Sequence, residues 1–215
     1  MTRLKDRTGV ILTTMAFLGT SLTLMRTRWY GITCSADYHV IDLRLPYYNL
    51  SGPIPSTIGQ LSFLQILILY SNQLIGTIPS TTGQLSSLYY LSLEGNQLTS
   101  TIPSTIGQLS SLQYLYLYIN QLTDTIPSTI IQLSSLYDLI LGYNQLSGNI
   151  LSTIGQLSSL QGLYLSFNQL TGTIPSAIGQ LSSLQYIFLY GNQEFQAGIS
   201  SHHSILFTKV LKIYY

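Results

Sequence analysis

Leucine and isoleucine recur along this chain with a period of 24 residues. Within each copy, apolar residues occupy positions 1, 4, 6, 11, 15, 19 and 22, and mostly polar or small residues stand between them. A repeat of this length predicts a solenoid, in which each coil buries its apolar edge only by stacking on its neighbours. Six full copies and a seventh that decays after Asn192 begin at Val40, Leu64, Leu88, Leu112, Leu136, Leu160 and Leu184.

Positions 3 to 7 of each copy alternate between variable and apolar residues. This period of two predicts a short strand with one buried face. Strands of successive copies should pair in parallel and line the inner side of the solenoid. We expect these strands near residues 42–45, 66–69, 90–93, 114–117, 138–141, 162–165 and 186–189.

The polar positions of the repeat predict its turns. Position 9 is Asn in six copies, which indicates a ladder of side chains that satisfies backbone groups where the chain turns. Position 13 is Gly in four copies, but Ser100 and Asp124 replace it in two others, so we do not expect a positive φ to be obligatory there. Proline at position 16 fixes φ. An extended piece and a short helical turn are therefore expected on the outer side.

The full spacing, L-x-x-L-x-L-x-x-N-x-L-x-G-x-I-P-x-x-I-G-x-L-x-x, resembles the plant-type class of leucine-rich repeats. The resemblance implies an α/β repeat solenoid. It would be a right-handed coil with a parallel concave β-sheet and short 3-10 or extended outer segments. In that family the fold serves receptor ectodomains and secreted inhibitor proteins. Because no kinase segment follows the repeats in this sequence, we expect a reduced or fragmentary member.

Upstream of the repeats, the run WYGITC at residues 29–34 resembles the end of the family's N-terminal cap. The cysteine that would pair with Cys34 in the family is replaced by Thr27. We therefore predict that Cys34 remains a thiol in the monomer. A single cysteine also provides neither an internal disulfide nor a metal cluster.

The ends of the chain differ from the repeats. Arg3, Lys5 and Arg7 precede an apolar run over residues 9–25, as in a secretory signal peptide or an uncleaved signal anchor. We predict a signal segment over 1–28, a truncated cap over 29–39, leucine-rich repeats over 40–193 and a tail over 194–215. Glu194 replaces a core leucine and should end the stacking. Secretion or membrane anchoring would expose Asn49 to glycosylation. The alternative is a cytoplasmic protein whose apolar segment packs on the solenoid.

Charge and residue inventory exclude several functions. Charged residues make up 7% of the chain, and no Lys or Arg lies between Arg44 and Lys209. This leaves no cationic surface for nucleic acid. His39, His202 and His203 lie outside the repeats, and no motif places a nucleophile beside a base. We predict no catalytic residue, no metal and no cofactor. Membrane contact is expected only through the N-terminal segment.

The variable positions of the repeat indicate where a ligand binds. The outer Ile-Pro-Ser-Thr and Gln-Leu-Ser-Ser segments barely change between copies, whereas the solvent-facing strand positions 2, 3, 5, 7 and 8 vary and are rich in tyrosine. Tyrosine offers a large rigid contact area with a polar tip. We predict binding of a protein, peptide or glycan by Tyr90, Glu94, Tyr114, Tyr116, Tyr118, Asp138, Tyr143, Tyr164, Phe167, Tyr186, Phe188 and Tyr190.

Three other interpretations compete with this one. Stacked aromatics also stabilise a parallel sheet. A structural protein would stack its open solenoid ends between chains. The outer Ser and Thr rows, which include Ser56, Thr57, Ser80 and Thr81, would suit a regular lattice such as ice or crystalline polysaccharide.

Overall fold

The computed structural model describes residues 30–193 and the backbone of residues 212–214. The predicted signal segment and most of the tail, with Glu194, lie outside the described residues. In the part of the chain that is described, no helix is long and apolar enough to cross a membrane. We number the coils 1 to 7 from Val40 to Leu184, by the starts of the repeats.

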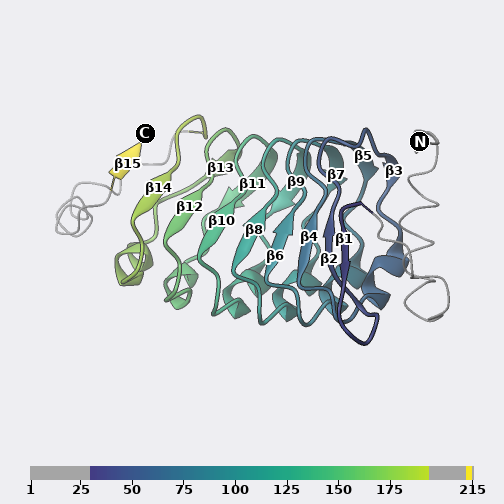
Figure 1. Cartoon of the computed structure of the whole chain (residues 1–215). Helices are drawn as coiled ribbons and strands as arrows, with labels where there is room; N and C mark the ends of the chain where they lie inside the picture. Colours follow the sequence, from purple (N-terminus) through teal and green to yellow (C-terminus); the bar gives the residue numbers. More distant parts are fainter. Residues whose placement is uncertain (1–29, 194–211, 215) are drawn as a thin grey trace.

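A nine-stranded sheet forms one wall of the solenoid (Figure 1). Each coil contributes one strand, and the strands of successive coils pair in parallel without a register shift, for example Leu91 opposite Leu115. This is the predicted concave sheet, and each predicted strand is found to within one or two residues. Its repeat strands are β2 (Val40–Arg44), β4 (Ile66–Ile68), β6 (Tyr90–Ser92), β8 (Tyr114–Tyr116), β10 (Asp138–Ile140), β12 (Gly162–Tyr164) and β14 (Tyr186–Phe188).

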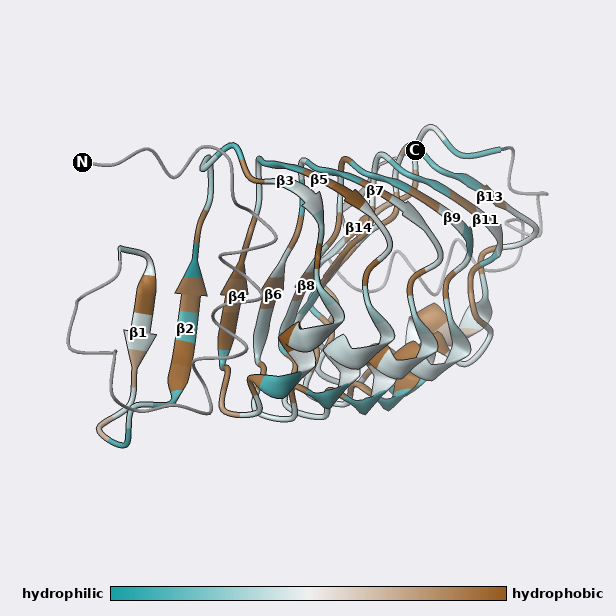
Figure 2. Cartoon of the chain, turned by 90° about the vertical axis from the view of Figure 1, so that its right-hand side faces the viewer, coloured by the Kyte–Doolittle hydropathy of each residue, from teal (hydrophilic) through white to brown (hydrophobic). Residues whose placement is uncertain are grey.

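The extended outer pieces form a second, six-stranded sheet that the sequence pattern did not predict. The 3-10 helices lie at the edge of the molecule that is opposite to this second sheet (Figure 1, Figure 2). The strands are β3 (Ser51–Pro53), β5 (Gln73–Gly76), β7 (Gln97–Ser100), β9 (Gln121–Thr125), β11 (Gln145–Asn149) and β13 (Gln169–Thr171). The 3-10 helices are η1 (Ser56–Gln60), η2 (Ser80–Gln84), η3 (Ser104–Gln108), η4 (Ser128–Gln132), η5 (Ile154–Gln156) and η6 (Ser176–Gln180).

The apolar positions of the repeat meet in one continuous core. In coil 4, Leu112, Leu115, Leu117 and Leu122 are fully buried, and the equivalent residues of the other coils stack on them. Each buried leucine contributes about 1.5–3 kcal/mol relative to an exposed one. Because every coil shares this core with its neighbours, no coil is expected to be stable alone.

The predicted asparagine ladder is present. In coil 3, the Asn96 amide nitrogen donates to the carbonyl oxygens of Leu69 at 3.0 Å and Leu93 at 2.9 Å. The Asn96 side-chain oxygen accepts from the Leu74 backbone N–H at 3.0 Å. Each asparagine thus bonds both to its own coil and to the preceding one. Asn72, Asn120, Asn144, Asn168 and Asn192 repeat the pattern.

The backbone at position 13 shows that the expectation of no obligatory positive φ there is wrong. The backbone has a positive φ at this position in all six coils, including 67° at both Ser100 and Asp124. The turn into the second sheet therefore requires the left-handed conformation whichever residue is present. Glycine adopts it without strain, whereas Ser100 and Asp124 do so at a cost.

The outer turns pack backbone against backbone. Proline precedes η1, η2, η3, η4 and η6 with φ between −71° and −62°. At position 20 the coils approach so closely that a Cβ on Gly83 would lie 2.4 Å from the Thr105 carbonyl oxygen. Coil 4 carries Ile131 at this position. The turn of coil 5, in which Leu151 replaces the proline, also differs: η5 is shorter than the other 3-10 helices and begins after Thr153, at φ −92° and ψ 4°.

Strands from outside the repeats cover both edges of the concave sheet. β1 (Ile32–Cys34) pairs antiparallel with β2 at the N-terminal edge, and Cys34 packs against the core. Burial raises the pKa of the Cys34 thiol. β15 (Lys212–Tyr214) pairs in parallel with β14 at the C-terminal edge. β1 and β15 are thus the edge strands of the sheet, and at three residues each they offer only a short template for further pairing.

Candidate ligand-binding face

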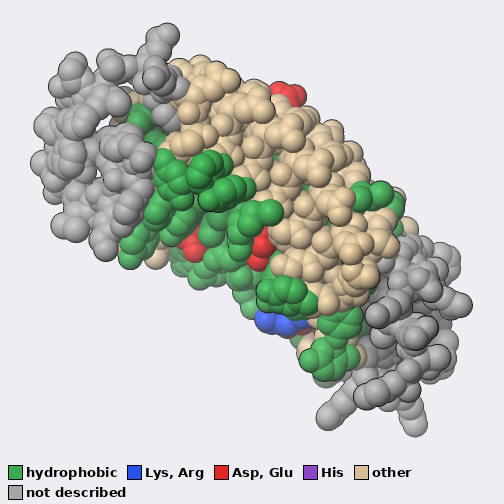
Figure 3. Space-filling model, turned by 90° about the horizontal axis from the view of Figure 1, so that it is seen from above, with side chains coloured by type: hydrophobic (Ala, Val, Ile, Leu, Met, Phe, Trp, Pro, Cys, Tyr) green, Lys and Arg blue, Asp and Glu red, His purple; other side chains and the backbone are tan. Residues whose placement is uncertain are grey.

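The side chains at positions 3, 5 and 7 stand on the solvent side of the nine-stranded sheet, which we call the concave face. Seen from above, hydrophobic side chains form a band along one side of the molecule, and acidic side chains lie between them (Figure 3). On the other side of the same strands, the leucines of the core pack beneath this band. The face therefore presents side chains on a rigid support.

A first aromatic cluster comprises Tyr90, Tyr114, Tyr116 and Tyr137 on coils 3 to 5. The ring of Tyr90 lies 5.3 Å from that of Tyr114 and 5.4 Å from that of Tyr116, measured between centroids. Tyr137 joins through Tyr114 at 5.9 Å. Tilted and edge-to-face pairs at these distances are favourable. All four side chains are half-buried, so they are less exposed than the sequence predicted, because they cover one another.

Asp138 lies between the first cluster and coil 6. The Tyr116 hydroxyl donates to the Asp138 carboxylate at 3.2 Å. Burial raises the pKa of Asp138, and this bond lowers it in part. Burial and the Asp138 charge raise the pKa of Tyr116, so its hydroxyl keeps the proton that it donates.

Glu94 is buried beneath the face, with 9% of its surface exposed. The Ser92 hydroxyl donates to its carboxylate at 2.7 Å. Burial raises the pKa of Glu94, and the bond from Ser92 opposes this shift. The expectation that Glu94 points freely to solvent is wrong, because the larger side chains around it cover it.

A second aromatic cluster links coils 5 to 7. The rings of Tyr164 and Phe188 stack at 4.7 Å and 13°, and Phe188 lies 6.4 Å from Tyr190. Phe167 lies 5.0 Å from Tyr190 and 4.3 Å from Tyr143. These five rings form a continuous surface. The structure thus brings five of the predicted residues together.

Two predicted residues lie apart from the ring contacts of these clusters. Among the described residues, neither Tyr118 nor Tyr186 has a ring pair at stacking distance. Tyr118 instead lies near Glu94, Tyr47 and Tyr70; burial and then the charges of these groups raise its pKa. Tyr186 is 39% exposed at the C-terminal end of the face.

Position 8 forms a row at the end of the concave strands. Its backbone is left-handed in every coil, with φ of 54° at both Ile119 and Tyr143 and 55° at Phe167. Tyr47 and Ile119 extend this row and are exposed, although sequence reasoning did not include them. Tyr137 was missed as well. These residues could have been found from the sequence, because they are large apolar side chains at variable, solvent-facing positions of the repeat.

Charge on the concave face is uneven. Arg44 binds the carboxylate of Asp42 at 2.8 Å, so this pair is neutral. Asp138 and Glu94 have no cationic partner within the described residues. That same part of the chain holds no group of three His, Cys, Asp or Glu residues able to bind a metal ion. Away from the face, Asn49 is exposed, and its side-chain oxygen accepts from Gln73.

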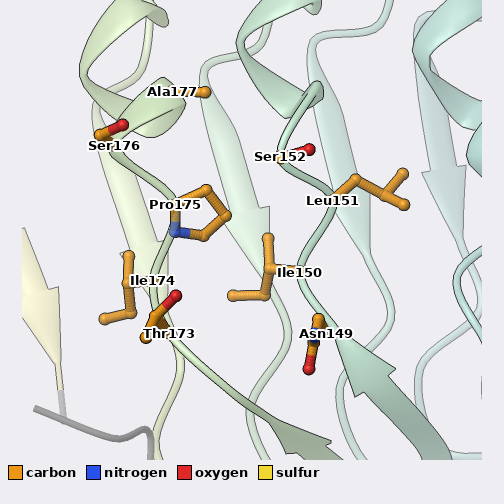
Figure 4. Close-up of a pocket in the computed structure, with 9 residues that line it drawn as sticks. All are labelled: Asn149, Ile150, Leu151, Ser152, Thr173, Ile174, Pro175, Ser176 and Ala177. Atoms are coloured by element: carbon orange, nitrogen blue, oxygen red, sulfur yellow. The ribbon is translucent and has the colours of Figure 1, made fainter. Parts of the chain in front are cut away.

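Three threonine hydroxyls on the outer side bond to the neighbouring coil. Thr81, Thr105 and Thr129 each donate to a serine carbonyl oxygen of the preceding coil at 2.6 Å. A hollow of about 580 Å³ opens between coils 5 and 6, where Leu151 replaces the usual proline and its side chain points away from Pro175 (Figure 4). The hollow has no charged side chain, and we assign it no ligand. It is lined by Asn149, Ile150, Leu151, Ser152, Thr173, Ile174, Pro175, Ser176 and Ala177.

Comparison with known proteins agrees with this geometry. Residues 62–122, 86–146 and 134–193 match the family model described as leucine rich repeat. The LRR receptor-like serine/threonine-protein kinase FEI 2 of Arabidopsis thaliana is 45% identical over 47 residues, which are 21% of this chain and 8% of that protein. The chain thus spans less than a tenth of the curated relatives that it matches.

Two solved structures are similar over most of the chain. The structure of PEPR1-AtPEP1 has a TM-score of 0.82 and 37% identity, and the match covers 87% of this chain and 26% of that one. The plant peptide hormone receptor RGFR1 in complex with RGF2 has a TM-score of 0.65 and 39% identity, over 66% and 23% of the two chains. The matched repeats span more than half of the sequence. The chain therefore belongs to the leucine-rich repeat family and carries repeats of the plant type.

Proposed function

We propose that this chain is a non-catalytic recognition module that binds a protein or peptide on its concave face, in a receptor-like or secreted protein. The observation that carries this proposal is the concentration of two aromatic clusters and two cation-free carboxylates on one rigid face. Aromatic side chains dominate the energetics of protein interfaces. The similarity to receptor-like kinases and to a peptide hormone receptor supports the same conclusion.

Exposure argues for recognition rather than packing alone. Tyr143 is 50% exposed and Phe167 is 40% exposed, although their rings already contact each other. Contiguous exposed apolar surface is a mark of interaction sites in soluble proteins. The exposed rings of the second cluster form such a surface.

Selection from a random library of 12-residue peptides on the immobilised protein tests this function. We expect selected peptides to lose affinity at least about 10-fold on Tyr116→Ala and Tyr164→Ala. Tyr30→Ala is the matched control, since Tyr30 is an exposed tyrosine outside the clusters. Equal binding to all variants would contradict the proposal. A glycan array probed with the same proteins tests the other ligand class; glycan binding that depends on these tyrosines, without peptide binding, would replace the peptide by a glycan.

The proposal also includes an extracellular location. The relatives are receptor-like kinases, and the side chain of Asn49 is exposed in an N-x-Ser sequence. Expression in a secretory eukaryotic host should give a product whose mobility shifts after glycosidase treatment, and Asn49→Gln should abolish that shift. Retention in the cytosol without a shift would favour the cytoplasmic alternative.

Assembly through the solenoid ends is the second candidate function. β1 and β15, the edge strands of the concave sheet, are only three residues long each, and short edge strands are poor templates for end-to-end pairing. Size-exclusion chromatography with light scattering should give a monomer at all concentrations. Multimers that grow with concentration would support the assembly function instead.

A further inference from the structure

The inference concerns the surroundings of Asp138 and rests on the proposed function, because it specifies what the ligand offers at one point of the concave face. Asp138 stands on β10, and Tyr116 and Tyr164 stand on the two neighbouring strands. The Tyr116 hydroxyl bonds to one carboxylate oxygen. The other oxygen lies over Gly162, where a Cβ would approach it to 2.4 Å.

The close approach of Asp138, and not a special backbone conformation, accounts for glycine at position 162. It lies within a strand, where glycine is unfavourable, and its φ is not positive. A Cβ at this position would also approach the Tyr164 ring to 2.6 Å. The missing side chain therefore leaves room for Asp138 between two tyrosines.

Charge at this point is unbalanced. On the concave strands of the seven coils, β2 to β14, Arg44 is the one Lys or Arg, and Asp42 already binds it. Glu94 is more deeply buried and is bonded to Ser92. Asp138 is thus the more accessible of the two uncompensated carboxylates.

We propose that Asp138, between Tyr116 and Tyr164, binds a basic side chain of the peptide ligand. A guanidinium or ammonium group that approaches Asp138 from the solvent would bind the carboxylate oxygen that Tyr116 does not hold. The ring of Tyr164 lies at the same point and offers such a cation an aromatic contact. Hydrogen bonds between charged groups are shorter and stronger than neutral ones, so this contact selects arginine or lysine at one position of the peptide.

Peptides selected from the random library on the wild-type protein provide the test. We expect the enriched sequences to share an arginine or lysine at one fixed position. Asp138→Asn should weaken their binding about 10-fold or more, as expected for loss of a charged hydrogen bond. Replacing the shared arginine by citrulline, or the shared lysine by acetyl-lysine, should cause a similar loss on the wild-type protein and little further loss on Asp138→Asn.

Asp124→Asn is the matched control, because Asp124 is an exposed carboxylate on β9 in the second sheet. It should leave the affinity unchanged, and melting curves of both variants should show an intact fold. Gly162→Ala, which displaces the carboxylate, should also weaken binding.

The outcomes separate the two proposals. Peptides that lack a basic residue and bind Asp138→Asn with unchanged affinity overturn the cation site. If the same peptides still lose affinity on Tyr164→Ala, the concave face remains the binding surface. If no substitution on this face changes their binding, both proposals fail.

Discussion

The concave face and the outer turns belong to the same coils but tolerate change differently. On the outer side, adjacent backbones touch at position 20, and the threonine hydroxyls there bond to the preceding coil. On the concave side, the backbones of neighbouring coils pair in the parallel sheet, and the side chains at positions 3, 5 and 7 project away from that backbone and contact one another, as Tyr90 and Tyr114 do. A side chain at position 20 would point into the neighbouring backbone, which favours glycine there, whereas side chains that project from the sheet to solvent can vary. This difference explains why the repeat is uniform outside and variable inside.

Coil 4 illustrates the limit on the outer side. Ile131 stands where the coil before it has Gly107, whose Cβ would lie 2.4 Å from the Thr129 carbonyl oxygen. In the following coil η5 is shortened, and among the described residues Thr153 makes no bond equivalent to that of Thr129. Two substitutions accompany this altered turn, Ile131 in coil 4 and Leu151 in place of the proline that precedes the other 3-10 helices. Variation on the concave face, by contrast, leaves the strand register unchanged.

The largest effect on stability is expected in the core behind the concave face. Leu117→Ala should lower the free energy of unfolding by about 2–5 kcal/mol, because Leu117 is fully buried and leaves a cavity. Tyr116→Ala, one residue away, should cost less stability but reduce peptide binding. Denaturant titration and peptide affinity, measured on both variants, check this. Equal losses of stability with unchanged affinity would make the tyrosine part of the scaffold.

Alanine substitution of one glycine on each side compares how much stability a new methyl group costs in the outer turns and on the concave face. Gly107→Ala should destabilise by about 1–3 kcal/mol, since the new methyl group meets backbone that cannot move independently. Gly162→Ala should cost less, because the new methyl group meets the side chains of Asp138 and Tyr164, which can rotate. Thermal melting of both variants tests the ranking. A larger loss for Gly162→Ala would mean that the concave face is packed as rigidly as the outer turns.

The burial of Glu94 predicts a pH dependence. Because the folded-state pKa of Glu94 is raised, the native state binds more protons than the unfolded state between the ordinary glutamate pKa and the raised one. Stability should therefore rise as the pH falls through this interval. Glu94→Gln should raise the melting temperature near neutral pH and weaken the pH dependence. The opposite change in melting temperature would indicate that the charge itself stabilises the face.

A smaller effect is expected at position 13. Ser100→Gly should raise the free energy of unfolding by about 0.5 kcal/mol. Glycine removes the strain of the left-handed conformation, and this gain exceeds the extra conformational entropy that glycine loses on folding. Ser110→Gly is the control, since Ser110 is exposed and its φ is not positive. It should destabilise slightly. Chemical denaturation resolves differences of this size if both variants share one m-value.

Periodicity predicted the parts of the fold that repeat. The parallel strands and the asparagine ladder follow from residues at fixed spacing, such as Leu91 and Asn96. The second sheet did not follow, because pairing of its extended pieces depends on how closely the coils stack. The edge strands β1 and β15 lie outside the repeat and were missed for that reason. Candidate site residues were found by variability, but the burial of Glu94 and the grouping of the rings depend on rotamers that spacing does not determine.

The asparagine ladder has a consequence for how such chains change in length. Each amide joins residues 22 and 27 positions earlier in the sequence, so it ties every coil to the one before it and to no other. Removing or duplicating one whole unit would preserve every bond of this kind, whereas a cut of any other size would strand buried amides. Duplication can therefore change the number of coils one coil at a time. The length of the surface available to a partner changes with the number of coils.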